Sequence, residues 1–152
     1  MIKGISFKIP SNEHKVLEKI LKEVDIKDYY CCNVKNQSEA WIEKDRNEAF
    51  LKKEIYNGND FQSQISKEYF IIFLKLEFYS RKPKKIDIHT FEEFKESSCE
   101  TVMLLYDCEY VEVYSKNFIL LNKIEENIKR NGFLDIQYWD EYNKERKVLD
   151  IV

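Results

Sequence analysis

The chain is poor in glycine, and this scarcity excludes a large class of nucleotide sites. Only three glycines, Gly4, Gly58 and Gly132, occur among 152 residues. They lie too far apart to form a glycine-rich loop of the kind that cradles phosphates. We therefore expect no site of the familiar mononucleotide- or dinucleotide-binding types.

Long apolar runs are also missing. The longest uninterrupted ones, YFIIFL at 69–74 and VMLLY at 102–106, are much shorter than the roughly 20 residues of a transmembrane helix. The N-terminal sequence MIKGISFKIPSNEHK has neither the apolar core nor the small-residue cleavage site of a secretory signal. These absences predict a cytoplasmic protein that does not associate with a membrane.

Cysteine and histidine are few, and their spacing argues against a metal site or a cysteine enzyme. The four cysteines contain no CxxC pair, and there are only two histidines, His14 and His89. Acidic neighbours flank Cys108 and oppose formation of a thiolate, whereas Cys99 is expected to follow a helix instead of preceding one. We expect reduced, partly buried cysteines, no metal, no cofactor and no catalytic residues. The cysteines are Cys31, Cys32, Cys99 and Cys108.

A large excess of one charge is lacking as well. The chain has 25 basic and 28 acidic residues, for a formal net charge of −3, so it has no general attraction for polyanions. The loop SRKPKK at 80–85 could contact phosphates, with Tyr79 stacking on a base, but a charged, solvated turn is the favoured interpretation. Nucleic acid is not expected as a partner.

What the chain does have is enough apolar side chain for one core. Hydrophobic residues make up 43% and aromatic residues 14% of the sequence, a composition well outside that of disordered chains. The length suits one domain, and no repeat or linker interrupts the chain. We predict a single domain over residues 1–152.

The N-terminal half shows mainly strand patterns. Residues 3–9 alternate at the two-residue period of a strand. Ser11 is placed to cap a helix that ends near Val24. Residues 29–34 and 39–43 predict a hairpin around the polar run 35–38, and NGND at 57–60 predicts a turn before a short helix. Residues 68–79, apolar and β-branched, predict a central strand covered on both faces at least over its first half.

The C-terminal half predicts further helices and strands in alternation. Thr90 and Glu93 have the spacing of a capping box and start a short helix. Strands are expected at 100–106 and 110–115 around a turn at Asp107–Glu109, then a helix at 117–131 ended by Gly132, and strands at 133–139 and 146–152. The order indicates an α+β fold, a mostly antiparallel sheet with two main helices and one or two short helices packed largely on one face.

Several segments together resemble a known family. They are GISFKIP at 4–10, ISKEYFIIFLKLEFY at 65–79, IHTFEEFKESSCETVMLLYDCEYVEVYSK at 88–116 and NGFLDIQYW at 131–139. The chain resembles the domain-of-unknown-function 2691 family of small uncharacterised bacterial proteins. The resemblance implies a small cytoplasmic bacterial protein, and the family offers no activity or catalytic residues to carry over.

One strand predicts a candidate binding surface. If Val111 and Val113 face the core, then Tyr110, Glu112 and Tyr114 point to the opposite face. Tyr106 joins them from the neighbouring strand, and tyrosine is enriched at interfaces. Alternatively, this face is covered by a helix or by the second half of the chain, or simply stays wet. Trp139, Asp140, Glu141 and Tyr142 could extend the surface.

Two classes of function follow from these patterns. The favoured one is a non-enzymatic module, an accessory, inhibitor or immunity-type protein, that binds another protein through Tyr106, Tyr110, Glu112 and Tyr114. The alternative is an enzyme or small-ligand-binding protein with a pocket near Asp107–Tyr110 and His89. The sequence leaves the oligomeric state and the identity of any partner open.

Overall fold

The computed structural model describes residues 1–143, 146 and 148–151, and a single antiparallel sheet runs through most of it. The sheet has eight strands in the order β3-β2-β5-β6-β7-β1-β8, with β4 paired to β2. The strands are β1 (Lys3–Lys8), β2 (Tyr30–Ile42), β3 (Asp45–Ala49), β4 (Ile55–Asn57), β5 (Tyr69–Tyr79), β6 (Cys99–Tyr106), β7 (Tyr110–Ser115) and β8 (Leu134–Asp140). The predicted α+β class is confirmed.

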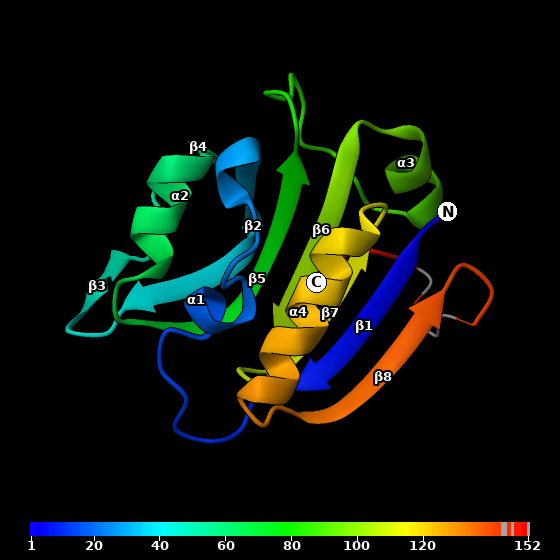
Figure 1. Ribbon diagram of the computed structural model, residues 1–152. Helices are drawn as coiled ribbons and strands as arrows, with labels where there is room; N and C mark the ends of the chain where they lie inside the picture. Colours follow the sequence, from blue (N-terminus) through cyan, green and yellow to red (C-terminus); the bar gives the residue numbers. More distant parts are fainter. Residues whose placement is uncertain (144–145, 147, 152) are drawn as a thin grey trace.

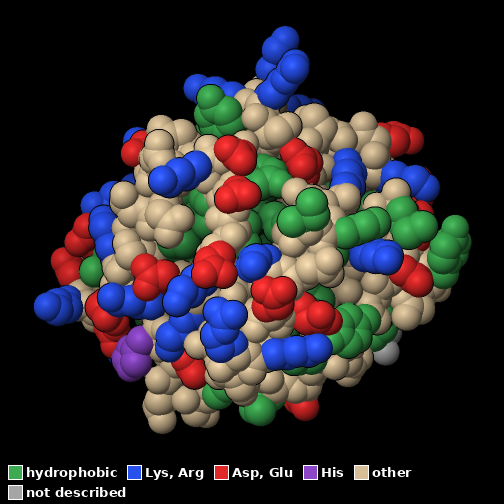
Figure 2. All heavy atoms as spheres, in the orientation of Figure 1, with side chains coloured by type: hydrophobic (Ala, Val, Ile, Leu, Met, Phe, Trp, Pro, Cys, Tyr) green, Lys and Arg blue, Asp and Glu red, His purple; other side chains and the backbone are tan. Residues whose placement is uncertain are grey.

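Three of the four helices cover one face of the sheet. Figure 1 shows α1 (Val16–Ile20), α2 (Gly58–Ile65) and α4 (Phe118–Arg130) in front of the strands. Their apolar side chains, including Leu17, Phe61 and Ile124, join the inward side chains of the strands in the larger core. In the described part of the chain, no helix is both long and apolar enough to cross a membrane. The outer surface of this layer mixes positive and negative side chains (Figure 2).

The opposite face carries a smaller core. There α3 (Phe91–Glu96) and Leu149, which lies near the C-terminus, pack on side chains such as Val102 and Leu104. Thr90 accepts a hydrogen bond from the backbone N–H of Glu93 at 3.1 Å, as the predicted capping box requires. The sheet is therefore covered on both faces, by helices on one and by α3 with the C-terminal residues on the other.

The predicted helix at 117–131 is confirmed by α4. The Asn117 side chain accepts hydrogen bonds from the backbone N–H groups of Ile119 and Leu120, both at 3.1 Å, which is the action of an N-cap. Gly132 follows the helix with φ +68°, a left-handed conformation that glycine adopts at little cost.

The predicted helix from Ser11 to Val24 is wrong at both ends. The helix begins only at Val16 because Lys15 has φ 51°, a left-handed conformation that helix interiors exclude. It ends at Ile20, and Ile26–Asp28 form a separate 3-10 turn, η1. The predicted apolar stripe still packs into the core, since Leu17, Ile20 and Leu21 are buried.

The predicted hairpin around residues 35–38 is also wrong. Tyr30–Ile42 form one continuous strand, and the polar run is accommodated as an irregularity opposite β5 between Asn33 and Ser38. Within the irregularity, the Ser38 hydroxyl donates to the carbonyl of Val34 at 2.8 Å. Strand β2 pairs with β5 on both sides of the polar run, so it continues past these residues.

Strand β5 is covered on both faces over its second half, whereas only one face is covered over its first half. Phe70 is 53% exposed, whereas every residue from Leu74 to Tyr79 is buried. The second half is covered on its other face because α3 and the C-terminal residues lie over it.

The predicted turn at 57–60 begins α2, where Asn57 acts as the N-cap. Of the strand predicted at 146–152, the described residues show one bridge, Val148 to Thr90, and positions 147 and 152 lie outside the described residues.

Candidate binding site

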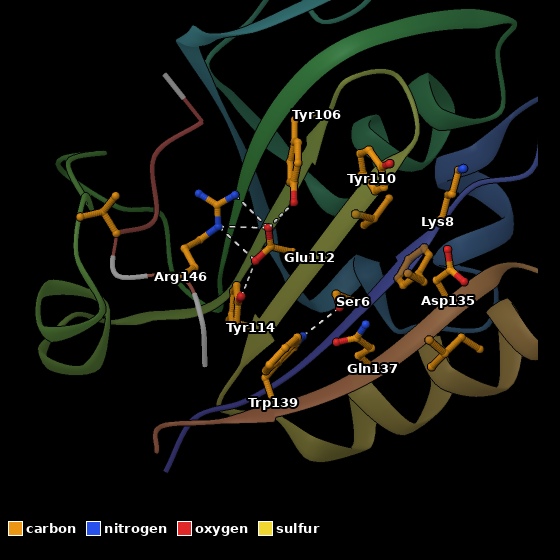
Figure 3. Close-up of a pocket in the computed structure, with 14 residues that line it drawn as sticks. Ser6, Lys8, Tyr106, Tyr110, Glu112, Tyr114, Asp135, Gln137, Trp139 and Arg146 are labelled. Carbon is orange, nitrogen blue, oxygen red and sulfur yellow. Dashed lines mark hydrogen bonds and ion pairs between the residues drawn. The ribbon is translucent and has the colours of Figure 1, made fainter. Parts of the chain in front are cut away.

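A groove of about 690 Å³ lies on the sheet face opposite α1, α2 and α4. Strands β6, β7, β1 and β8 supply most of its lining, and Arg146 and Val148 border it. Figure 3 shows how the labelled side chains point into it from the neighbouring strands. We call it the tyrosine groove and define it by Ser6, Lys8, Tyr106, Tyr110, Glu112, Gln137, Trp139 and Arg146.

The register of the sheet explains why these side chains meet. Glu112 pairs with Ser6 across β7 and β1, and Ser6 pairs with Gln137 across β1 and β8. Tyr110 pairs in the same way with Lys8 on one side and Tyr106 on the other. Directly opposite residues in antiparallel strands project from the same face, so the groove consists of two parallel rows of side chains.

Tyr114 shares this face but does not reach the surface. It is only 2% exposed, because its ring lies over Gly4 and contacts Phe91 edge-on, with ring centroids 5.0 Å apart. A Cβ atom at Gly4 would lie 2.6 Å from the Tyr114 ring, so the close approach requires glycine here. The valine alternation is confirmed, but the predicted exposure of Tyr114 is wrong, because α3 covers that end of the face.

Glu112 is the centre of a hydrogen-bond network. Its carboxylate accepts hydrogen bonds from the hydroxyls of Tyr106, at 2.7 Å, and Tyr114. Arg146 donates from Nη2 at 2.8 Å and from Nε at 3.0 and 3.1 Å to the two oxygens. Glu112 is 9% exposed, so it supports the groove from below instead of presenting a free charge.

The network fixes the protonation states of its members. Burial would raise the pKa of Glu112, but the hydrogen bonds from Arg146, Tyr114 and Tyr106 outweigh it and hold the pKa below its usual value of 4.5. Burial, and then the neighbouring Glu112 carboxylate, raise the pKa of Tyr106 to about 12. At neutral pH Glu112 is therefore ionised, and both tyrosines keep their protons.

The accessible wall of the groove is aromatic and polar. Tyr110 is 38% exposed, and its ring lies 5.7 Å from that of Tyr106. The Trp139 indole N–H donates to the Ser6 hydroxyl at 2.8 Å, which fixes the indole against the floor. Gln137 is exposed beside it, and its side-chain amide forms no hydrogen bond with another described residue. Rigid aromatic faces and a free amide are thus available to a ligand.

A second polar cluster lies further along the same face, beneath the C-terminal residues. Lys75 is fully buried and donates to the carbonyl of Ile88 and to Asp150 at 3.2 Å. Glu77, also fully buried, accepts from the Tyr79 hydroxyl at 2.7 Å and lies 3.8 Å from the Lys75 ammonium. His89 contacts Asp150 at 3.0 Å through Nδ1.

The pKa values in this cluster move in different directions. Burial raises the pKa of Glu77 above its usual value. The hydrogen bonds that the His89 ring donates to Asp150, and then to Asp87, raise the pKa of His89. Burial alone would raise the pKa of Asp150, but the hydrogen bonds from Gln37, His89 and Lys75 outweigh this effect and lower the pKa. The cluster joins the C-terminal residues to β5 through Lys75 and to β2 through the side-chain amide of Gln37.

The alternative hypothesis placed a pocket near Asp107–Tyr110 and His89, but these residues do not line one groove. His89 belongs to the Lys75 cluster, and Cys108 lies exposed in the turn between β6 and β7. Of the segment Asp107–Tyr110, Tyr110 lines the tyrosine groove, and neither Asp107 nor His89 does so. The other three cysteines, Cys31, Cys32 and Cys99, are buried and free.

Sequence reasoning missed half of the groove. Arg146 stands 34 residues from Glu112 along the chain, and no local pattern links the two. Ser6, Lys8 and Gln137 lie within the strands predicted at 3–9 and 133–139, but the sequence does not mark them as site residues. Their place in the groove depends on β1 lying between β7 and β8, which the sequence does not reveal.

The fold and groove define a small α+β protein with an open groove on one sheet face. The family described as "Protein of unknown function (DUF2691)" matches residues 2–150, and the chain belongs to this family. It is 31% identical over 156 residues to "Uncharacterized protein YncE" of Bacillus subtilis (strain 168), across 99% of this chain and 100% of that relative. No solved structure matches the chain significantly.

Proposed function

We propose that this protein is a cytoplasmic, non-enzymatic binding module, of an accessory, inhibitor or immunity type, that holds a segment of a partner protein in the tyrosine groove. The observation that supports the proposal is the combination of accessible aromatic faces, Tyr106 and Tyr110, with the exposed Gln137 amide on one open surface. Tyrosine offers a large, rigid contact area at low entropic cost and is enriched at interaction hot spots.

The state of Glu112 favours binding over catalysis at this surface. A general acid or base must exchange a proton near neutral pH. Glu112 instead stays ionised and is hydrogen-bonded by Arg146, Tyr106 and Tyr114. A nucleophilic role is disfavoured for the same reason, because its oxygens already accept hydrogen bonds.

The charges of the groove suggest the chemistry of the partner segment. Arg146 is paired with Glu112, and Lys8 lies 3.6 Å from Glu109. Because both cations are matched within the protein and the exposed Asp135 carboxylate also lines the groove, an acidic segment would gain little. We infer that the groove selects an extended segment without acidic side chains that stacks on the tyrosines and hydrogen-bonds with Gln137.

The test is a comparison of groove variants in affinity capture from native lysate of the source cells. Tyr110→Ala combined with Gln137→Ala should abolish recovery of at least one partner protein that the wild type captures at near-equal stoichiometry. Tyr142→Ala, which alters a tyrosine that is 91% exposed outside the groove lining, is the matched control and should keep that partner. Identical capture by all three forms would contradict the proposal.

A small molecule is the second candidate for the same groove, because about 690 Å³ lies within the range of roughly 300–1,000 Å³ usual for small-molecule sites. A thermal-shift screen of a metabolite collection with the purified chain distinguishes the two ligand classes. A stabilising compound whose effect disappears in the double groove variant but persists in Tyr142→Ala would favour the small-ligand role. The protein-partner proposal expects no such compound.

A further inference from the structure

We propose that His14, Glu43 and Glu68 form a binding site for one divalent transition-metal ion of the zinc type. The site is independent of the tyrosine groove, since none of the three residues lines it. One potential ligand atom from each side chain lies within 4.8 Å of the other two. An imidazole nitrogen with two carboxylate oxygens is a donor set that zinc accepts.

The sheet fixes the two carboxylates opposite each other. Ile42, at the end of β2, pairs with Tyr69, at the start of β5. Glu43 and Glu68 lie one residue beyond this pair, and the backbone N–H of Glu43 donates to the carbonyl of Glu68 at 3.1 Å. Two like charges held at directly opposed positions repel each other, so this end of the sheet favours a cation between them.

His14 approaches from a different part of the chain. It lies in the segment between β1 and α1, and its Nδ1 atom is 3.9 Å from Oε2 of Glu43 and 3.7 Å from Oε2 of Glu68. Lys15 contacts the other oxygen of Glu68, Oε1, at 3.9 Å. The Oε2 atoms of both carboxylates therefore face the imidazole, while the neighbouring lysine does not occupy that position.

The spacing is close to what one ion requires. Ligand atoms about 2.0–2.2 Å from zinc are roughly 3.3–3.6 Å apart at tetrahedral angles. The two imidazole–carboxylate distances are 3.7 and 3.9 Å, so small side-chain rotations would bring the three donors onto one ion. All three side chains are exposed at a hollow of about 540 Å³, which Lys44 also borders. Water would complete the coordination.

Charge and donor type select the ion. Two carboxylates neutralise one divalent cation, and the nearby ammonium groups of Lys15 and Lys44 weaken the attraction for any further cation. Ca²⁺ needs six to eight oxygen ligands, and Mg²⁺ rarely uses imidazole. A zinc-type ion therefore fits better than either of these.

The experiment is isothermal titration calorimetry of the untagged, full-length chain with ZnCl₂, because an oligohistidine tag would itself bind zinc. We expect saturable binding of one Zn²⁺ per chain and no comparable binding of Mg²⁺. His14→Ala and Glu68→Gln should each weaken Zn²⁺ binding by about tenfold or more, the scale on which changes around a metal reduce its affinity.

The chain offers two matched controls. His89→Ala removes the other histidine, which is paired with Asp87 and Asp150, and should bind Zn²⁺ as the wild type does. Cys108→Ser removes the exposed thiol and should also leave binding unchanged. No saturable Zn²⁺ binding by the wild type, or equal loss in His14→Ala and a control variant, would overturn the proposal.

Discussion

The two faces of the sheet are buried by different chemistry. On one face, helices α1, α2 and α4 cover the strands with apolar side chains such as Leu17, Phe61 and Ile124. On the other face, a smaller apolar core is joined by the buried charged residues Lys75, Glu77 and Glu112, and ion pairs and hydrogen bonds help to hold the C-terminal residues there.

The two faces of one sheet therefore differ in the interactions that stabilise them. The apolar face depends on area removed from water, which changes little with pH. The polar face depends on the protonation of several groups and leaves an open groove where its covering ends. The candidate binding surface therefore lies on the face whose burial is incomplete and charged.

The largest expected effect is on the apolar face. Phe61→Ala should lower the free energy of unfolding by about 3–5 kcal/mol, because Phe61 is fully buried and contacts Tyr56 and Phe78 edge-on. Urea denaturation followed by circular dichroism measures the loss. The loss should be the same at pH 5 and pH 8; a loss confined to one pH would contradict the apolar account of this face.

The matching change on the polar face is Lys75→Met. It removes the cation next to Glu77 and Asp150 while keeping a similar apolar stem, and breaking such a buried pair costs about 3 kcal/mol or more. Urea denaturation of the double variant Lys75→Met with Glu77→Leu is the control. It should recover much of the stability, because the buried carboxylate is then gone. No recovery would show that Lys75 acts through packing alone.

A smaller effect is expected from Glu112→Gln. The substitution keeps the shape of the side chain but weakens the bond to Arg146, at an expected cost of about 1–3 kcal/mol. The folded pKa of Glu112 lies below its usual 4.5, so the unfolded chain binds the proton more readily. The stabilisation by Glu112 is complete above about pH 4.5 and is lost as the pH falls through the folded pKa. Stability measured from pH 6 to pH 3 should fall less steeply in the variant than in the wild type.

The smallest effect concerns His89. Its pKa is raised above 6.5 by Asp150 and Asp87, so its contribution is fully present below about pH 6.5 and is lost as the pH rises through the folded pKa. The urea midpoint of the wild type should therefore decline slightly from pH 6 to pH 9. His89→Ala should remove that decline. An unchanged decline in the variant would assign it to another group.

The parts of the fold predicted from the sequence are those set by local pattern. Helix α4 had an N-cap, an apolar stripe and a terminal glycine within 16 residues, Asn117 to Gly132. The turn at Asp107 and Cys108 was equally local, and both residues adopt positive φ. Such signals do not depend on the rest of the chain.

The parts of the fold that were predicted wrongly depend on contacts between segments far apart in the sequence. The polar residues 35–38 indicate a turn, but β5 supplies a partner long enough to keep β2 continuous. The sequence predicts cover on both faces at least for the first half of the strand at 68–79, yet the C-terminal residues and α3 cover Lys75 and Glu77 in its second half. The groove was found in part, through Tyr106, Tyr110 and Glu112. Arg146 and the cluster of His14, Glu43 and Glu68 became apparent only in the three-dimensional arrangement.

We propose that Tyr110 lies against a partner protein. Site-specific photocrosslinking in the source cells tests this contact, with a photoreactive phenylalanine analogue at position 110 and, for comparison, at position 142. We expect a discrete crosslinked product from position 110 and none from position 142. No product at position 110, or the same product from both positions, would contradict it.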